Sequence, residues 1–224
     1  MLLGILFNVC LIAANLLETK VIQVFGITVT AGLLVFPVSY IINDCIAEVW
    51  GFRKARLIIW SGFAMNFFVV MLGLIAVALP AAPFWEGRPI QFCLWHGAAH
   101  CRGKFVGISG GSFLNAYVMS RMKVASGGRH FSARAIWSTV AGETADSLIF
   151  FPVAFGGIIA WQELLVMMCI QIVLKSLYEV LILPVTIRVV NAIKRIDGSD
   201  VYDEGISYKV WKSVRFNGLS IVKQ

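Results

Sequence analysis

The sequence predicts an all-α integral membrane protein with six transmembrane helices and both termini in the cytoplasm. Hydrophobic residues make up 59% of the 224 residues, and charged residues only 14%. Several apolar runs exceed about 18 residues, which is long enough for a helix to cross a hydrocarbon core. The period-two alternation of an outer-membrane barrel is absent from the sequence. Composition and run length therefore favour helices in a lipid bilayer.

The positive charge of the chain lies in short clusters between the apolar runs. The net charge is +7, and a nucleic-acid-binding surface would gather such residues on one face. Clusters between spans instead indicate cytoplasmic loops, so we expect no direct contact with nucleic acid. Six helices with both termini inside place all the clusters on one side. The clusters are Arg53 to Arg56, Arg121 to Arg134, and Lys194 with Arg195.

The first half of the chain is predicted to contain three spans. The first, from residue 4 to about 17, lacks a positively charged start, which favours a short membrane helix, from a chain truncated at its start, over a cleaved signal peptide. Residues 18–30 are too mixed for a span and are predicted to form an extended or re-entrant link. The second span covers about 31–50 and ends at Gly51, and the third covers about 57–79.

The second half is predicted to contain three more spans after a polar loop at 81–104. They cover about 105–120, 135–158 and 161–190, and the first of them is weakly apolar. The chain is polar from Asp197 onward. We therefore assign residues 1–195 to one transmembrane domain and residues 196–224 to a cytoplasmic tail without a fold of its own.

Three of the predicted spans carry ionisable residues at helical spacing. Separations of three or four residues place the members of each set on one helix face, and such a face is expected to point into a protein interior or a wet cavity. We predict that the three faces form one substrate-binding site. The residues are Tyr40, Asp44 and Glu48 in the second span, Glu143, Asp146 and Ser147 in the fifth, and Lys175, Tyr178 and Glu179 in the sixth.

Some of these residues also have a structural interpretation. Glu48 lies near the end of its span, beside Arg53, and could simply reach the membrane interface. Lys175 could be a counter-ion for one carboxylate, and Tyr40 and Tyr178 could be packing aromatics. Five carboxylates against one lysine cannot all be ionised in a dry interior. The pattern therefore suits a cation, or a neutral ligand rich in N–H donors.

Three motifs carry a family resemblance. They are FPxxYxxxDxxxExxG from Phe36 to Gly51, WSTVAGETADSLIFFPVAF from Trp137 to Phe155, and KxxYExxxxP from Lys175 to Pro184. Together they resemble the queuosine precursor transporters of the vitamin-uptake-like transporter superfamily, over most of residues 10–195. The resemblance implies six transmembrane helices and import of 7-deazaguanine bases across the inner membrane for tRNA modification. These bases are the cyano precursor preQ0, the aminomethyl precursor preQ1 and queuine, and the resemblance does not select among them.

Other functions are weighed against this one. The substrate-binding S component of an energy-coupling-factor vitamin importer is similarly small and six-helical, and co-purification with ATPase subunits would distinguish it. An enzyme is not expected, because the sequence has no HExxH motif and no catalytic dyad, and no cofactor is expected either. The expected partners are the bilayer and a small-molecule substrate, with a homodimer left open.

The resemblance fails abruptly over residues 92–110. This stretch contains Cys93, His96, His100 and Cys101, whose spacing could suggest zinc, although we predict no metal site. Codons can be chosen for the stretch that, displaced by one base, encode an apolar span continuous with SFLNAYVMSRMK. We therefore interpret residues 92–110 as a frame-shifted segment that compromises the fourth helix. The alternative is a divergent native loop.

Overall fold

The protein is described here from a computed structural model, which is mainly helical. The residues that the structure describes are 1–18, 20–24, 27–80, 110–156, 160–206 and 208–209. The predicted polar loop at 81–104, the Cys/His cluster and nearly all of the stretch interpreted as frame-shifted lie outside these residues. The elements are α1 (Leu2–Leu17), β1 (Val21–Val24), β2 (Ile27–Thr30), the 3-10 turn η1 (Ala31–Leu34), α2 (Phe36–Ala78), a helix at 110–126, α4 (Phe131–Phe155) and α5 (Trp161–Asp197).

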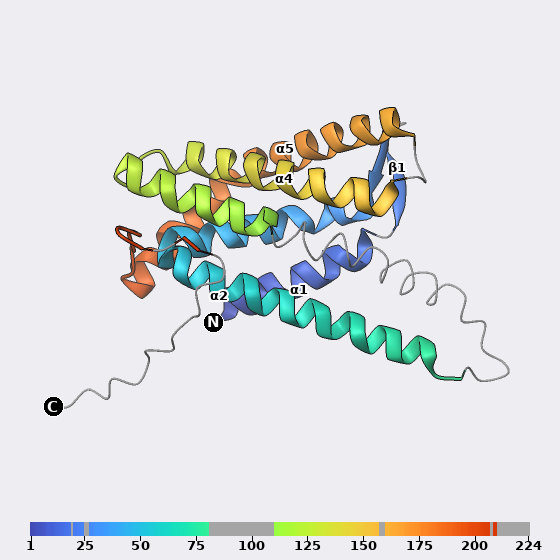
Figure 1. The fold of residues 1–224 in the computed structure, drawn as a ribbon. Helices are drawn as coiled ribbons and strands as arrows, with labels where there is room; N and C mark the ends of the chain where they lie inside the picture. The colour runs from blue at the N-terminus through green and yellow to red at the C-terminus, as the bar shows by residue number, and fades with distance from the viewer. Residues whose placement is uncertain (19, 25–26, 81–109, 157–159, 207, 210–224) are drawn as a thin grey trace.

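The all-α prediction fits this architecture, with one small exception. Residues 18–30 were predicted to be extended or re-entrant, and β1 and β2 pair there as an antiparallel hairpin with Val21 opposite Thr30. The hairpin lies at one end of the bundle, called the hairpin end below (Figure 1). Gln171 of α5 donates a hydrogen bond from Nε2 to Thr30 Oγ1 at 2.8 Å, which ties the hairpin to the helices.

By length and composition, two of the described helices could cross a membrane. They are α2, with a mean hydropathy of 2.1 over its most apolar stretch, and α5, with 1.9. The apolar helix α1 is shorter, at 16 residues. Large apolar side chains such as Phe68 and Leu181 are exposed on these helices, as expected for surfaces that meet lipid rather than water.

The second and third predicted spans are the two halves of α2, separated at Gly51. We expected a basic linker between them, and this expectation was wrong, because Arg53, Lys54 and Arg56 lie within helical residues. The link is Gly51 alone, whose φ of 78° and ψ of 174° are accessible essentially only to glycine. Figure 1 shows that the second half of α2 runs back along the bundle.

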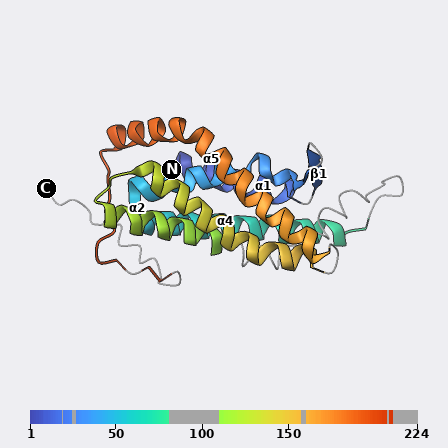
Figure 2. The ribbon, with the colours of Figure 1, turned by 90° about the horizontal axis from the view of Figure 1, so that it is seen from above.

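The remaining boundaries differ from the predicted ones by a few residues. The second span begins at Phe36 rather than residue 31, because η1 precedes it and Pro37 favours the first turn of a helix. The fourth span appears, in the described part, as the helix at 110–126. α5 extends to Asp197, where Gly198 adopts a φ of 63° and donates to Lys194 O at 3.0 Å. α5 also bends along its length, and Pro184 lies inside it (Figure 2).

The apolar core lies between α1, both halves of α2 and the helix at 110–126. Its buried members include Phe7 from α1, Phe36 and Phe52 from α2, and Phe113. A second buried cluster, which contains Phe150, joins α4 to α5. Figures 1 and 2 both show α4 and α5 side by side. Counted with α2 as two halves, the described chain has six helical segments, which run alternately toward and away from the hairpin end.

The described part of the tail, residues 198–206 and 208–209, has no helix or strand, but it is docked on the bundle. Asp203 Oδ2 accepts hydrogen bonds from the Phe52 backbone N–H at 2.7 Å and from Ser120 Oγ at 2.6 Å. Phe52 begins the helical run after Gly51, so Asp203 caps a helix start that the break leaves open. Val201 N–H donates to Val49 O at 3.1 Å. We did not expect this docking, and the end of the bundle where it occurs is called the tail end below.

Replacing Gly51 by alanine is expected to destabilise the protein by about 1–3 kcal/mol, because the backbone there is strained for any other residue. A Cβ on Gly51 would also lie 2.7 Å from Asp203 Oδ1, which would displace the cap. Gly127→Ala is the matched control, since Gly127 has a φ of 59° but nothing within 4 Å of its Cβ position. Thermal unfolding in detergent measures both variants, and equal losses would show that the Asp203 contact contributes nothing.

Candidate functional site

Buried polar side chains form a column through the bundle, on the facing sides of α2, α4 and α5. Each of these side chains is at most 3% exposed. Their spacing of three or four residues keeps the members from each helix on one face. The column, called the polar column below, consists of Tyr40, Asn43 and Asp44 from α2, Glu143, Asp146 and Ser147 from α4, and Gln171, Lys175 and Glu179 from α5.

Lys175 is paired within the polar column. Its Nζ lies 2.8 Å from Glu143 Oε2, and both side chains are buried. The same Nζ lies 3.9 Å from the centroid of the Phe36 ring, which is within cation–π range. This geometry agrees with the counter-ion interpretation of Lys175.

Asp44 of α2 lies next to Glu179 of α5, one helical turn beyond Lys175 along α5. The Asp44 carboxyl is fully buried, lies beside the Glu179 carboxyl, and accepts a hydrogen bond from Ser138 Oγ at 3.3 Å. Glu179 also lies beside Thr139 of α4. Neither acid is in an ion pair with any residue that the structure describes.

Tyr40 lies where the helix at 110–126 and α4 approach most closely. A Cβ on Gly111 would be 2.6 Å from Tyr40 Oη, and a Cβ on Gly142 would be 2.8 Å from Tyr40 Cε1. The two glycines therefore provide the space that the ring occupies. The Tyr40 hydroxyl is buried and has no hydrogen-bond partner within the part of the chain that the structure describes. Tyr178, which the sequence placed with this site, is only half-buried, unlike Lys175 and Glu179 on the same helix.

Most of the unpaired polar atoms in the polar column are hydrogen-bond acceptors. A buried polar atom without a partner costs about 1–3 kcal/mol, so these atoms favour a ligand that supplies donors. Asn43 cannot turn its amide freely, because Nδ2 donates to Asn115 Oδ1 at 2.6 Å and to Ser112 O at 3.2 Å. The acceptors are Asn43 Oδ1, Asp44 Oδ2, Glu143 Oε1, Gln171 Oε1 and Glu179 Oε2.

Sequence reasoning missed several uncharged members of this region. Gln171 could have been found, because it lies four residues before Lys175 on the same helix face. Asn43 directly precedes Asp44, but its role depends on Asn115 of another helix. Ser138 and Thr139 lie within the second family motif, but they were not assigned to the site, since hydroxyls in a helix commonly bond to their own backbone.

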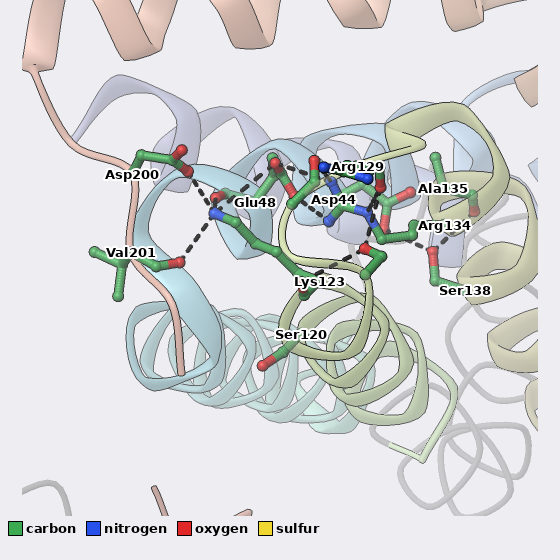
Figure 3. A network of polar contacts seen from close by, with 12 residues as sticks. Asp44, Glu48, Ser120, Lys123, Arg129, Arg134, Ala135, Ser138, Asp200 and Val201 are labelled. Atoms are coloured by element: carbon green, nitrogen blue, oxygen red, sulfur yellow. Dashed lines mark hydrogen bonds and ion pairs between the residues drawn. The ribbon is translucent and has the colours of Figure 1, made fainter. Parts of the chain in front are cut away.

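Glu48 lies outside the polar column, in a group of charges at the tail end (Figure 3). Arg134 donates to the Glu48 carboxylate from Nη1 at 2.6 Å and from Nη2 at 3.2 Å, and Lys194 Nζ lies 2.8 Å from the same carboxylate. Lys123 Nζ is 3.8 Å from the same carboxyl and 2.5 Å from Asp200 of the tail. These five residues are called the ion cluster below. Glu48 thus holds helices together at this end rather than reaching the membrane interface.

All three basic residues of the ion cluster, Lys123, Arg134 and Lys194, belong to the basic clusters that we interpreted as topology signals, and two of them are fully buried. Lys123 and Arg134 are only 2% and 1% exposed, so their charges are neutralised inside the protein rather than displayed in a loop. The tail contributes to this neutralisation. Burial alone would raise the pKa of Asp200, but its hydrogen bonds from Lys123 and Lys194 outweigh burial and lower the pKa. The tail contact is therefore stabilising above the unfolded pKa of Asp200, and is lost as the pH falls through the lowered value.

The comparisons with known proteins cover the part of the chain that contains the polar column. The model of the family described as "Putative vitamin uptake transporter" matches residues 30–189, which include every residue of the polar column. The chain belongs to this family. A protein of Bacillus subtilis (strain 168) named "Probable queuosine precursor transporter" is 28% identical over 155 residues, which are 66% of this chain and 65% of that protein. The chain thus spans just under two thirds of the length of this curated relative. No solved structure matches.

Membership of the vitamin uptake transporter family confirms the resemblance recognised from the three motifs, and makes this chain a membrane protein of a transporter family. The described residues contain no group of three His, Cys, Asp or Glu side chains placed to hold a metal ion.

Lys175→Met is expected to destabilise the protein by about 3–5 kcal/mol, because it leaves the buried Glu143 carboxylate unpaired. The double variant Lys175→Met with Glu143→Gln removes both charges and should recover most of the loss. Thermal unfolding in detergent measures this. A stable, well-expressed Lys175→Met protein with weakened substrate binding would instead identify Lys175 as a ligand of the substrate.

Proposed function

We propose that this protein imports queuosine precursors, which are 7-deazaguanine bases, across the inner membrane for use in tRNA modification. The observation that carries the proposal is the set of unpaired acceptor oxygens in the polar column. A guanine-like base presents several N–H donors along one edge, and a carboxylate can accept two of them at once. The name of the Bacillus subtilis relative and the three sequence motifs support the same substrate class.

In this proposal the base lies among α2, α4 and α5. Asp44 or Asp146 accepts hydrogen bonds from its donor edge, and the ring packs against an aromatic side chain such as Tyr40. A second carboxylate carries a proton. The nine residues assigned from the sequence contribute unequally, because Glu48 is engaged in the ion cluster and Tyr178 is only half-buried. Transport proceeds by alternating access around the base-binding site among α2, α4 and α5.

The proposal includes a multi-pass arrangement of six spans with both termini in the cytoplasm. The alternating directions of the helical segments support it, and so do the exposed Arg53, Lys54 and Arg121 at the tail end, which the positive-inside rule places in the cytoplasm. Cysteine labelling from outside intact cells tests the topology. Positions 54 and 127 should be inaccessible and position 86 reactive, and the reverse pattern would overturn the arrangement.

Uptake of labelled precursors tests the proposed function directly. Cells that lack both their own precursor synthesis and their own uptake system should accumulate a labelled 7-deazaguanine base only when they express this protein. The same cells expressing no transporter provide the background. Accumulation no higher than that background, for preQ0, preQ1 and queuine alike, would reject the proposal.

One alternative function, in vitamin import, is favoured by the description of the family, which names vitamin uptake. In this alternative the protein is the substrate-binding component of an energy-coupling-factor importer and works only with partner ATPase subunits. Purification from its native membrane under mild conditions distinguishes the two. Stable association with ATPase subunits, and uptake that requires them, would support the alternative.

A further inference from the structure

The end of the polar column nearest the tail end contains two acids that have no cationic partner among the residues that the structure describes. Asp44 and Glu179 are 0% and 3% exposed, and their carboxyls lie side by side. Buried carboxylates in proteins are normally paired with a cation or bound to a ligand. Lys175, the nearest buried cation on the same helix as Glu179, is already paired with Glu143.

The cations of the ion cluster are also engaged. Arg134 and Lys194 both bind Glu48, and Lys194 in addition lies 2.8 Å from Asp200. Every described cation that borders the polar column is therefore neutralised by an acid other than Asp44 and Glu179. Among the described residues, the pair therefore has no cation that compensates its negative charge.

The unpaired atoms around the pair indicate what would bind there. Asp44 Oδ2 and Glu179 Oε2 both lack a hydrogen-bond partner among the described residues. Two carboxyls in contact cannot both be ionised in a dry site, so the pair holds one proton and one negative charge. An ammonium group carries three donors and one positive charge, and it matches these oxygens.

A third unpaired group lies one helical turn away. The Tyr40 hydroxyl is buried, has no hydrogen-bond partner among the described residues, and precedes Asp44 by four residues on the same face of α2. It is held in place by the close approach of Gly111 and Gly142, and it lies near enough to Asp44 for the two groups to interact electrostatically. This observation is independent of the two acids.

We propose that Asp44 and Glu179 bind a protonated amine, so that this protein selects a base with a cationic side chain over one with a neutral side chain. The inference rests on the proposed function and narrows its substrate class. The aminomethyl group of preQ1 is such a cation, whereas the nitrile of preQ0 is a neutral acceptor that would face the oxygens of the pair. Contact between the nitrile and these acceptor oxygens is unfavourable, and binding sites commonly use such contacts to reject a competitor of similar shape.

The pH dependence of binding follows from the same arrangement. A second proton on the acid pair removes the negative charge that attracts the amine, so the preference for the cationic base should weaken as the pH falls. The titratable and polar groups that interact with the pair are Tyr40 from α2, Asn115 from the helix at 110–126, and Ser138, Thr139 and Glu143 from α4. Glu143 is itself paired with Lys175 of α5.

Equilibrium binding of preQ1 and preQ0 to the purified full-length protein in detergent tests the inference. We expect preQ1 to bind at least about 10-fold more tightly, equivalent to one decade in the dissociation constant. Glu179→Gln should bring the ratio close to one. Glu163→Gln is the matched control, since it makes the same change on an exposed residue of the same helix and should keep the wild-type ratio.

The outcomes separate the two proposals. Binding of neither base would reject the proposed function. Equal binding of both bases to the wild-type protein, or tighter binding of preQ0, would overturn the inference and leave the proposed function standing. If Glu179→Gln does not fold, the wild-type protein still tests the inference through the pH dependence of binding. A preference for preQ1 over preQ0 that does not weaken as the pH falls would also overturn the inference.

Discussion

Asp44→Asn is expected to reduce uptake of the labelled base by at least about 100-fold while leaving the protein folded in the membrane. The amide keeps the volume of the carboxyl but replaces one acceptor by a donor, and it removes the negative charge. Sites built on specific hydrogen bonds commonly lose this much or more when one partner is mismatched. Ser138 Oγ can still donate to the remaining oxygen, so the packing around residue 44 is expected to persist.

The measurement is the initial rate of uptake, normalised to the amount of protein in the membrane. Glu163→Gln is again the control, because Glu163 is exposed and outside the polar column. Asp146→Asn is expected to have a similarly large effect. Near wild-type transport in both Asp44→Asn and Asp146→Asn would remove the polar column as the substrate site.

Arg134→Met is expected to destabilise the protein by about 3–5 kcal/mol, because it leaves Glu48 short of its bidentate partner inside the protein. Arg134 also donates to the backbone carbonyls of Gly128 and Arg129, so the start of α4 loses its attachment as well. Thermal unfolding in detergent is the measurement.

Arg129→Met provides the comparison for Arg134→Met, since it makes the same change at an exposed position just before α4. It should change stability by less than about 0.5 kcal/mol. A second comparison is Arg134→Met with Glu48→Gln, which removes the charges on both sides and should be milder than Arg134→Met alone. Equal stability of Arg134→Met and the wild type would mean that the ion cluster does not hold the tail end together.

Much of the fold followed from local properties of the sequence. Long apolar runs predicted the helices, and the change from apolar to mixed residues at 18–30 predicted an extended link, because these depend only on neighbouring residues. Acids within apolar runs predicted an interior face, since such groups are costly against lipid. Gly51 was identified as the end of a span, but not as the whole connection, because a single positive φ is not visible in composition.

The sequence by itself determined which faces of α2, α4 and α5 are polar, because residues spaced by three or four share a face on any helix. Only the tertiary structure decided which charges meet. Lys175 could have paired with Asp44, Asp146 or Glu143, and the depth and rotation of α4 against α5 selected Glu143. Lys123 and Arg134 resembled loop charges because the positive-inside rule counts residues without regard to where their side chains point. Ion pairs between helices depend on packing over the whole bundle, and no short stretch of sequence contains that information.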